Sequence, residues 1–359
     1  MEDCYIIKDT RLYDNFKDRT YSDYKKSEVL NTLFKNIEQK NIEEACFWLA
    51  ECILSGYIID IFERMIIFSC KIIHINNPKL PSYLWNRYQT FYNSFSHINQ
   101  KQKQDFLQLR NSQHIRNLLF DLLTTLTISS KDKRYDKYPK VKDEDFNFQN
   151  IEGKLIATMN ILPSTLMKYG DPDELKIIMN EIFYNLKIIG GYEKSCYWIT
   201  WTIQWEKLNK KKGHWCISER NIEGVKKQYC TDVVWLLWRV IFEEANLRDD
   251  NIKKQIQALF LLYKHNFTSG KRNVRLPYVY HAIGYLTLPI KFNIKVRKDE
   301  DIFLKTQCNI NKIFQGKKKH ENKNYVEPPK ENKKVITTDK EIQHSQLKRI
   351  QEIDEIFFS

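Results

Sequence analysis

The chain has 359 residues, 42% of them hydrophobic and 13% aromatic, which excludes a largely disordered protein and allows a core sufficient for two domains. Its 58 Lys and Arg exceed its 45 Asp and Glu, so the formal net charge is +13 at pH 7. Ten glycines and nine prolines are few for a fold of many short strands and turns, which disfavours an all-β class.

Helical periodicity organises the first third of the chain after a polar and aromatic lead-in. Apolar residues recur on one helical face from residue 27, and Ser27 is the predicted N-cap. Gly56 ends the second predicted helix, and Pro78 ends the third. The five predicted helices cover residues 27–37, 42–55, 58–75, 81–91 and 111–128. They predict a helical domain over residues 1–130.

The second half follows a charged stretch, residues 131–150, that lacks an apolar period and is the predicted linker. Asp171-Pro172-Asp173-Glu174 predicts a helix start with Asp171 as the cap, and Gly190-Gly191 ends that helix. A tryptophan-bearing helix and further helices at 231–244 and 252–264 complete a basic, Trp-rich domain over residues 151–315. Residues 290–296 alternate as a lone strand would.

The last part of the chain is polar and rich in Lys, Glu and Asn. This composition predicts a disordered linker over residues 316–345 and a terminal docking helix over residues 346–359. The predicted fold is therefore predominantly all-α, with two helical-bundle halves and a disordered C-terminal tail.

A short motif occurs twice. Ala45-Cys46-Phe47-Trp48-Leu49 returns as Ser195-Cys196-Tyr197-Trp198-Ile199, each time after an amphipathic helical stretch. The repetition predicts a helical unit that is used twice, in an architecture of helices packed on helices.

Six of the eight tryptophans lie between residues 198 and 238. Trp198, Trp201 and Trp205 share one helical face, as do Trp235 and Trp238. This spacing favours a core seam between two helices, and a stacking platform for nucleobases is the alternative interpretation.

Positive charge concentrates in the second half, where residues 201–300 hold 19 basic and 10 acidic residues. Such a surface indicates a phosphate-bearing or acidic partner, while a plain solvated surface is the alternative. The candidate nucleic-acid contacts are Lys210, Lys211, Lys212, Lys226, Lys227, Lys271, Arg272 and Arg275. Contacts of this kind give sequence-independent, salt-sensitive binding.

Catalytic and metal-binding motifs are not found in the sequence. It contains no phosphate-binding loop, dinucleotide fingerprint, zinc-protease motif or nucleophile elbow, so no catalytic residue and no cofactor is predicted. His214, Cys216 and Cys230 lack the number and spacing of a structural zinc site. The apolar stretch 58–73 is interrupted by charges, so no membrane partner is expected.

The cysteines favour a reducing compartment. Most lie in apolar helical runs, where a thiol behaves as a small hydrophobe. The chain opens with Met1-Glu2-Asp3 and shows no secretory leader, so an intracellular location is expected: the cytoplasm, the nucleus or a viral factory.

Residues 21–130 resemble the helical collar domain of clamp-loader-like AAA+ proteins, most closely the replication-restart branch. The matching stretches are Leu30-Asn31-Thr32-Leu33-Phe34-Lys35-Asn36-Ile37 and Ala45-Cys46-Phe47-Trp48-Leu49-Ala50. In that family the collar mediates oligomerisation and follows an ATPase module. The resemblance implies self-association through residues 21–130, without the ATPase activity, because about twenty residues precede the match.

The second half looks like a group of uncharacterised proteins from large nucleocytoplasmic DNA viruses. The stretches that carry this resemblance are Tyr197-Trp198-Ile199-Thr200-Trp201 and Asp232-Val233-Val234-Trp235-Leu236-Leu237-Trp238. That group has no assigned activity to transfer to this chain.

The final residues resemble the box that binds sliding clamps, a pattern of Gln, an aliphatic residue and two aromatics. Asp354 occupies the aliphatic position, where burial of its carboxylate would be costly. A helix that docks on the protein's own body is the alternative. The candidate docking residues are Gln351, Ile353, Ile356, Phe357 and Phe358.

These observations predict a non-catalytic intracellular adaptor or scaffold associated with DNA replication or maintenance. Its expected partners are DNA, a sliding clamp or other replication protein at the tail, and a second copy of the chain. A virion or assembly-factor protein that acts through protein contacts is the first alternative, and an enzyme of unrecognised type is the second.

Overall fold

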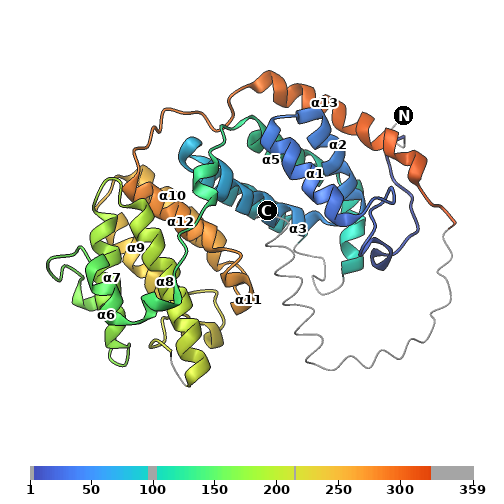
Figure 1. Cartoon of the computed structure of the whole chain (residues 1–359). Coiled ribbons are helices and arrows are strands. Elements are labelled where there is room, and N and C mark those ends of the chain that lie inside the picture. Colours follow the sequence, from blue (N-terminus) through green and yellow to red (C-terminus); the bar gives the residue numbers. More distant parts are fainter. Residues whose placement is uncertain (1–3, 96–102, 214–215, 325–359) are drawn as a thin grey trace, which may run out of the picture. The chain divides into compact units, whose positions relative to one another are not determined.

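All regular elements are helical in the part of the chain that the computed structural model describes, residues 4–95, 103–213 and 216–324 (Figure 1). Within these ranges there is one isolated antiparallel β-bridge, which joins Arg19 and Lys25. The predicted all-α fold is confirmed. Residues 290–296 form turns and bends, so the predicted strand is wrong. A strand needs a neighbour for its ladder hydrogen bonds, and the described residues supply none.

Two compact units divide the chain, and both are discontinuous in sequence. Unit 1 comprises Met1–Ile61, Ser94–Thr127 and Asp299–Ser359, and unit 2 comprises Phe62–Asn93 and Ile128–Lys298. The sequence instead suggests contiguous halves, because periodicity locates helices and carries no information on which of them pack together.

Unit 1 is built around a helical hairpin. Its helices are α1 (Lys26–Gln39), α2 (Ile42–Leu54), the first turn of α3 (Ile58–Phe68), α5 (Gln113–Ile128) and α13 (Glu300–Lys317). The chain reverses between α1 and α2 at Lys40, whose φ of 64° is left-handed and whose N–H bonds to carbonyls of the last helical turn. Lys25 is the residue at the N-cap of α1, two residues before the predicted cap Ser27, so the prediction of Ser27 as the cap is wrong.

α13 packs on α2, and a buried ion pair joins the two helices. Lys317 Nζ lies 2.6 Å from Glu51 Oε2, with side chains 3% and 0% exposed, and 3.5 Å from the Phe47 ring centroid. Burial would raise the pKa of Glu51, but Lys317 and hydrogen bonds, including one from the amide of Ser22, outweigh it and lower that pKa.

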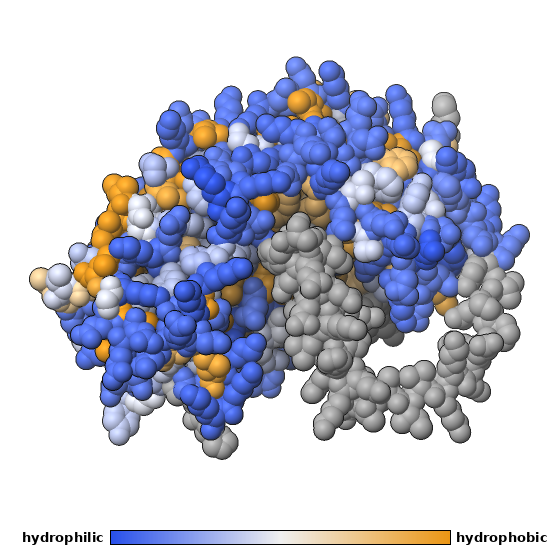
Figure 2. Space-filling model, in the orientation of Figure 1, coloured by the Kyte–Doolittle hydropathy of each residue, from blue (hydrophilic) through white to orange (hydrophobic). Residues whose placement is uncertain are grey.

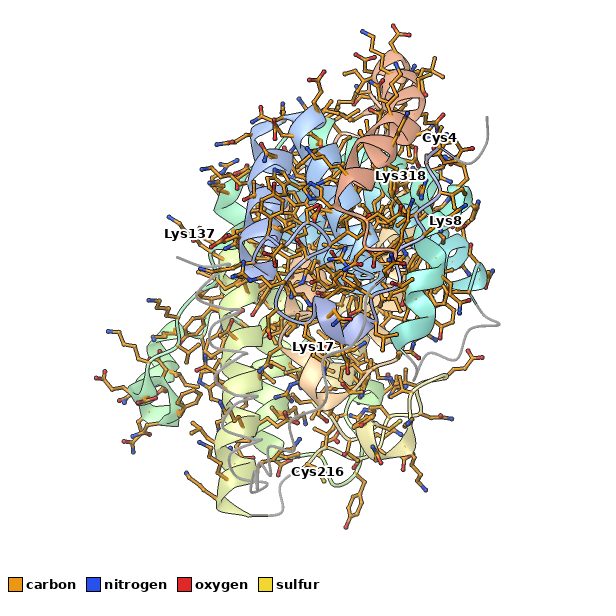
Figure 3. The ribbon with its side chains drawn as sticks, turned by 90° about the vertical axis from the view of Figure 1, so that its right-hand side faces the viewer. Cys4, Lys8, Lys17, Lys137, Cys216 and Lys318 are labelled. Carbon is orange, nitrogen blue, oxygen red and sulfur yellow. The ribbon has the colours of Figure 1, made fainter. Side chains whose placement is uncertain are left out.

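The first residues of the predicted disordered linker are therefore structured. Asn322 accepts a hydrogen bond from the amide of Thr10 and donates its own amide to Asp9. Figure 3 places Lys318, at the end of α13, on the same side as Cys4 and Lys8. The prediction of disorder from Gly316 onward is wrong for residues 316–324, because composition does not register the long-range contacts that hold them.

Unit 2 surrounds a central helix. Its helices are the rest of α3, α4 (Leu80–Asn93), α6 (Phe148–Ile151), α7 (Asp173–Leu186), α8 (Tyr192–Lys212), α9 (Val234–Ala245), α10 (Asp250–Lys264), α11 (Ser269–Arg272) and α12 (Leu276–Thr287). α12 packs against α7, α8, α9 and α10, and nearly all its residues are buried. The sequence does not predict α12 because a helix that is apolar on all sides has no amphipathic period.

The predicted charged linker packs onto unit 2. The amide of Asp132 donates to the carbonyl of Ile72 over 2.7 Å, and Lys71 pairs with Asp136 at 2.7 Å. The carbonyl of Asp145 accepts a 2.6 Å hydrogen bond from the indole of Trp201. Two of these contacts use backbone groups and one uses a side chain of the segment, so a stretch without an apolar period still packs as part of the unit.

The repeated motif occupies equivalent places in the two units. α1 packs with α2, α7 packs with α8, and each motif lies near the start of the second helix of its pair. Cys46 and Cys196 are both buried, and burial raises the pKa of the Cys46 thiol to about 12. Both cysteines therefore serve as small core residues.

Candidate functional site

A group of exposed lysines lies at the end of α8 and in the loop that follows it. Lys210, Lys211 and Lys212 occupy the last turn of α8, and Lys226 and Lys227 are exposed in the loop before α9. We call these five residues the lysine surface. Each of them was a predicted nucleic-acid contact. Figure 3 marks Cys216, an exposed thiol, within the same loop.

Arg272, another predicted contact, points into the protein. Its guanidinium pairs with Glu206 and lies 3.1 Å from Asp232 Oδ1, and 13% of its side chain is exposed. Burial favours the neutral form of Asp232 and raises its pKa, Glu206 adds to this, and Arg272 offsets part of it. Arg272 is a structural counter-ion for two buried carboxylates and is withdrawn as a phosphate contact.

Arg275 is withdrawn for the same reason. It donates to the carbonyl oxygens of Tyr263 and His265 over 2.7 and 2.6 Å and lies 3.3 Å from Glu63. Lys271, which is 37% exposed, pairs with the same Glu63 at 3.2 Å. The sequence could not reveal Glu63 as a partner, because it lies 208 positions before Lys271 and 212 positions before Arg275.

Buried carboxylates leave the lysine surface positive. Glu206 accepts hydrogen bonds from Lys210 Nζ over 2.9 Å and from the amide of Val233 over 3.1 Å, and its side chain is fully buried. Residues 207–227 carry six lysines, whereas their two glutamates are Glu219 and Glu223. Glu206 thus pairs with Lys210 inside this region, while Lys211, Lys212, Lys226 and Lys227 face solvent, so the region attracts anions.

Five tryptophans of α8 and α9 belong to the core. Trp198, Trp201, Trp235 and Trp238 are at most 1% exposed, and Trp205 is 8% exposed. The indole rings of Trp201 and Trp205 stack with their centroids 5.4 Å apart. The prediction that these tryptophans lie in the core is confirmed, but they do not form one seam between their two helices: α8 packs mainly on α7 and α12, whereas α9 packs on α7, α10 and α12. The alternative of a stacking platform is wrong for these five residues because all of them are buried.

An exposed aromatic residue lies elsewhere. Tyr169 has a relative exposure of 104%, so its ring is as open to solvent as in a free peptide. The sequence reasoning did not identify it. A signal was present in Lys168-Tyr169-Gly170-Asp171, where an aromatic residue stands at a turn outside any apolar period.

The interior of unit 2 contains a pair of stacked histidines. His74 and His281 are fully buried, with ring centroids 4.4 Å apart, and His74 also stacks on Tyr135 at 4.1 Å. Neither imidazole makes a hydrogen bond of regular geometry to a described residue. Burial lowers the pKa of His74 to about 3 and lowers that of His281 well below its usual value, so both are neutral at pH 7.

His74 also interrupts the predicted third helix. α3 ends at Phe68, a π-helical turn follows over Ser69–Ile73, and His74 has a left-handed φ of 50°. The sequence predicts this helix through residue 75 because its apolar run continues that far. The unusual backbone directs the His74 ring against Gly284 of α12, where an added Cβ would lie 2.2 Å from Cε1.

The described residues do not bring together three or more His, Cys, Asp or Glu side chains that could hold a metal ion. His214 lies outside the described residues, and Cys230 is buried with its thiol 3.6 Å from the carbonyl of Lys226.

Within the described residues, no helix combines the length and the apolar character needed to cross a bilayer. The face drawn in Figure 2 is mainly hydrophilic, with hydrophobic residues in separate patches.

The chain was compared with family models, with curated proteins and with solved structures. No family model, curated protein or solved structure matches the chain. The predicted tail contacts, which lie at Gln351, Ile353, Ile356, Phe357 and Phe358, are outside the described residues.

Proposed function

We propose that the chain is a non-catalytic helical adaptor that contacts nucleic acid through the lysine surface and acts in DNA replication or maintenance. The observation that supports it best is the separation of charge at the end of α8. Glu206 and Asp232 are buried with Arg272, while Lys211, Lys212 and their neighbours are exposed. A phosphate backbone complements such a surface, and binding would release condensed counterions.

The other parts of the proposal come from the sequence. Residues 21–130 would support self-association, as the resemblance to a collar domain implies. The tail would recruit a partner such as a sliding clamp through the aromatic pair Phe357-Phe358. A tethered motif of this kind raises the local concentration of its partner without enlarging the folded interface.

Binding of a fluorescein-labelled 30-mer DNA, measured by anisotropy from 25 to 300 mM salt, tests the nucleic-acid contact. We expect the full chain to bind in the micromolar range at low salt, with affinity that falls steeply as salt rises, as is typical of backbone contacts. Replacement of Lys211, Lys212, Lys226 and Lys227 with Glu should abolish binding at 100 mM salt.

A matched variant controls for net charge. Lys17, Lys35, Lys305 and Lys312 are exposed in unit 1, and their replacement with Glu changes the net charge by the same amount. We expect this variant to keep most of the affinity. Absence of binding by the unmodified chain at 25 mM salt would refute the nucleic-acid role and favour an assembly protein.

A further inference from the structure

Tyr169 is held at the tip of a rigid turn. Asp171 and Arg220 form an ion pair at 2.5 Å, and both side chains are 1% exposed. Asp171 also accepts hydrogen bonds from the amides of Lys168 and Ser218 over 2.6 and 2.9 Å. The predicted helix cap Asp171 therefore does not cap α7, whose N-cap is Pro172. It fixes the turn instead.

The backbone around the tyrosine ring is fixed as well. Ser218 Oγ donates to the carbonyl of Tyr169 over 2.6 Å, and Arg220 donates to the carbonyl of Leu166 over 3.2 Å. Gly170 has a φ of 86°, a conformation that glycine adopts without strain. Because the turn is already ordered, a partner of this ring gains contact area with little loss of conformational entropy.

The turn belongs to the same loop assembly as part of the lysine surface. Lys168 Nζ donates to the carbonyl of Glu219 over 2.9 Å, and the amide of Arg220 donates to the carbonyl of Cys230 over 2.9 Å. Lys226 and Lys227 lie just before Cys230 in that loop. An exposed aromatic ring and exposed lysines are thereby held on connected backbone, which is the combination that single-strand binders use.

We propose that Tyr169 stacks on an unpaired base, so that the preferred ligand of the lysine surface is single-stranded nucleic acid. This inference rests on the proposed function, since the lysines would supply the backbone contacts. In a duplex the base faces are already stacked on one another, and a ring on a surface turn cannot reach them. The base faces of a single strand are accessible.

Anisotropy with labelled dT20 and with a 20-base-pair duplex, at a fixed salt concentration, tests the inference on the full chain. We expect tighter binding of dT20 and a loss on the order of 10-fold for Tyr169→Ala, because base–aromatic stacking contributes at about this level. Tyr169→Phe should bind as the unmodified chain does, since the ring face is kept. The duplex affinity should be unchanged in both variants.

Leu304→Ala serves as the control, because Leu304 is 61% exposed on α13 and belongs to unit 1. The salt slope separates this inference from the proposed function. Tyr169→Ala should lower affinity for dT20 without changing the slope, whereas the lysine variant lowers both. If Tyr169→Ala binds dT20 normally while the lysine variant does not, the stacking inference is refuted and the proposed function stands. If the unmodified chain binds neither DNA, both are refuted.

Discussion

The buried histidine pair should make the stability of the protein depend on pH between 7.5 and 5. An unfolded histidine has a pKa near 6.5, whereas burial lowers that of His74 to about 3 and that of His281 in the same direction. The unfolded chain therefore binds more protons below pH 6.5, and the free energy of unfolding falls as pH decreases. The contribution is complete above pH 6.5 and is lost as the solution becomes more acidic.

The magnitude follows from the shift. His74 alone should cost about 2 kcal/mol of stability between pH 7.5 and pH 5, since each bound proton contributes about 1.4 kcal/mol per pH unit below 6.5. His281 adds a loss of the same sign. This is a substantial part of the 5–15 kcal/mol that typically stabilises a protein.

Urea unfolding at pH 7.5, 6.5, 5.5 and 5 measures the effect. His281→Phe keeps a ring stacked between His74 and Tyr285 but cannot be protonated, so the pH slope should fall by up to about 1.4 kcal/mol per pH unit. His114→Gln, a change of an exposed histidine on α5, should leave the slope unaltered. Equal slopes for the parent and His281→Phe would refute the reasoning.

Further predictions concern close packing and buried charge. Gly284→Ala should destabilise the protein by about 1–3 kcal/mol in urea unfolding, because its Cβ would overlap His74, whereas an exposed helical glycine would gain stability from the same change. A gain in stability would contradict the packing of His74. Lys317→Met should cost about 3–5 kcal/mol, since it leaves Glu51 charged and buried without its partner, and a loss below 1 kcal/mol would mean that the pair is solvated. Arg272→Glu should lower the melting temperature far more than Lys211→Glu, because the change removes the counter-ion of buried Glu206 and Asp232 and adds a third carboxylate beside them. Equal melting temperatures would show that Arg272 is on the surface.

Most helices with one apolar face could be predicted from the sequence, and a helix that is apolar on nearly all sides could not. α2 and α10 begin and end within two residues of the predicted bounds. α12 is apolar on nearly all sides, so it lacks an amphipathic period. α13 has such a period, with Phe303, Ile310 and Phe314 on its buried face, but its overall composition is polar and no helix is predicted over these residues. The pairing of Lys317 with Glu51 spans 266 positions and depends on the tertiary fold alone.

The candidate site shows the same limit. A count of charges treats Lys211 and Arg272 alike, although the first is exposed and the second neutralises buried carboxylates. The tryptophans were predicted as core from their spacing, which reflects a property of the helix itself. The exposure of Tyr169 depends on a turn that Arg220 holds from some fifty positions away, and such a contact leaves no local pattern.

The salt dependence of single-strand binding tests the central claim most directly. Replacement of Lys211, Lys212, Lys226 and Lys227 with Gln should lower the slope of log K against log salt for dT20 by up to about 3, since each lost phosphate contact on a single strand contributes about 0.7. The same replacement at Lys17, Lys35, Lys305 and Lys312 should leave the slope unchanged. An unaltered slope in the first variant, or an equal decrease in both, would contradict the assignment of nucleic-acid binding to the lysine surface.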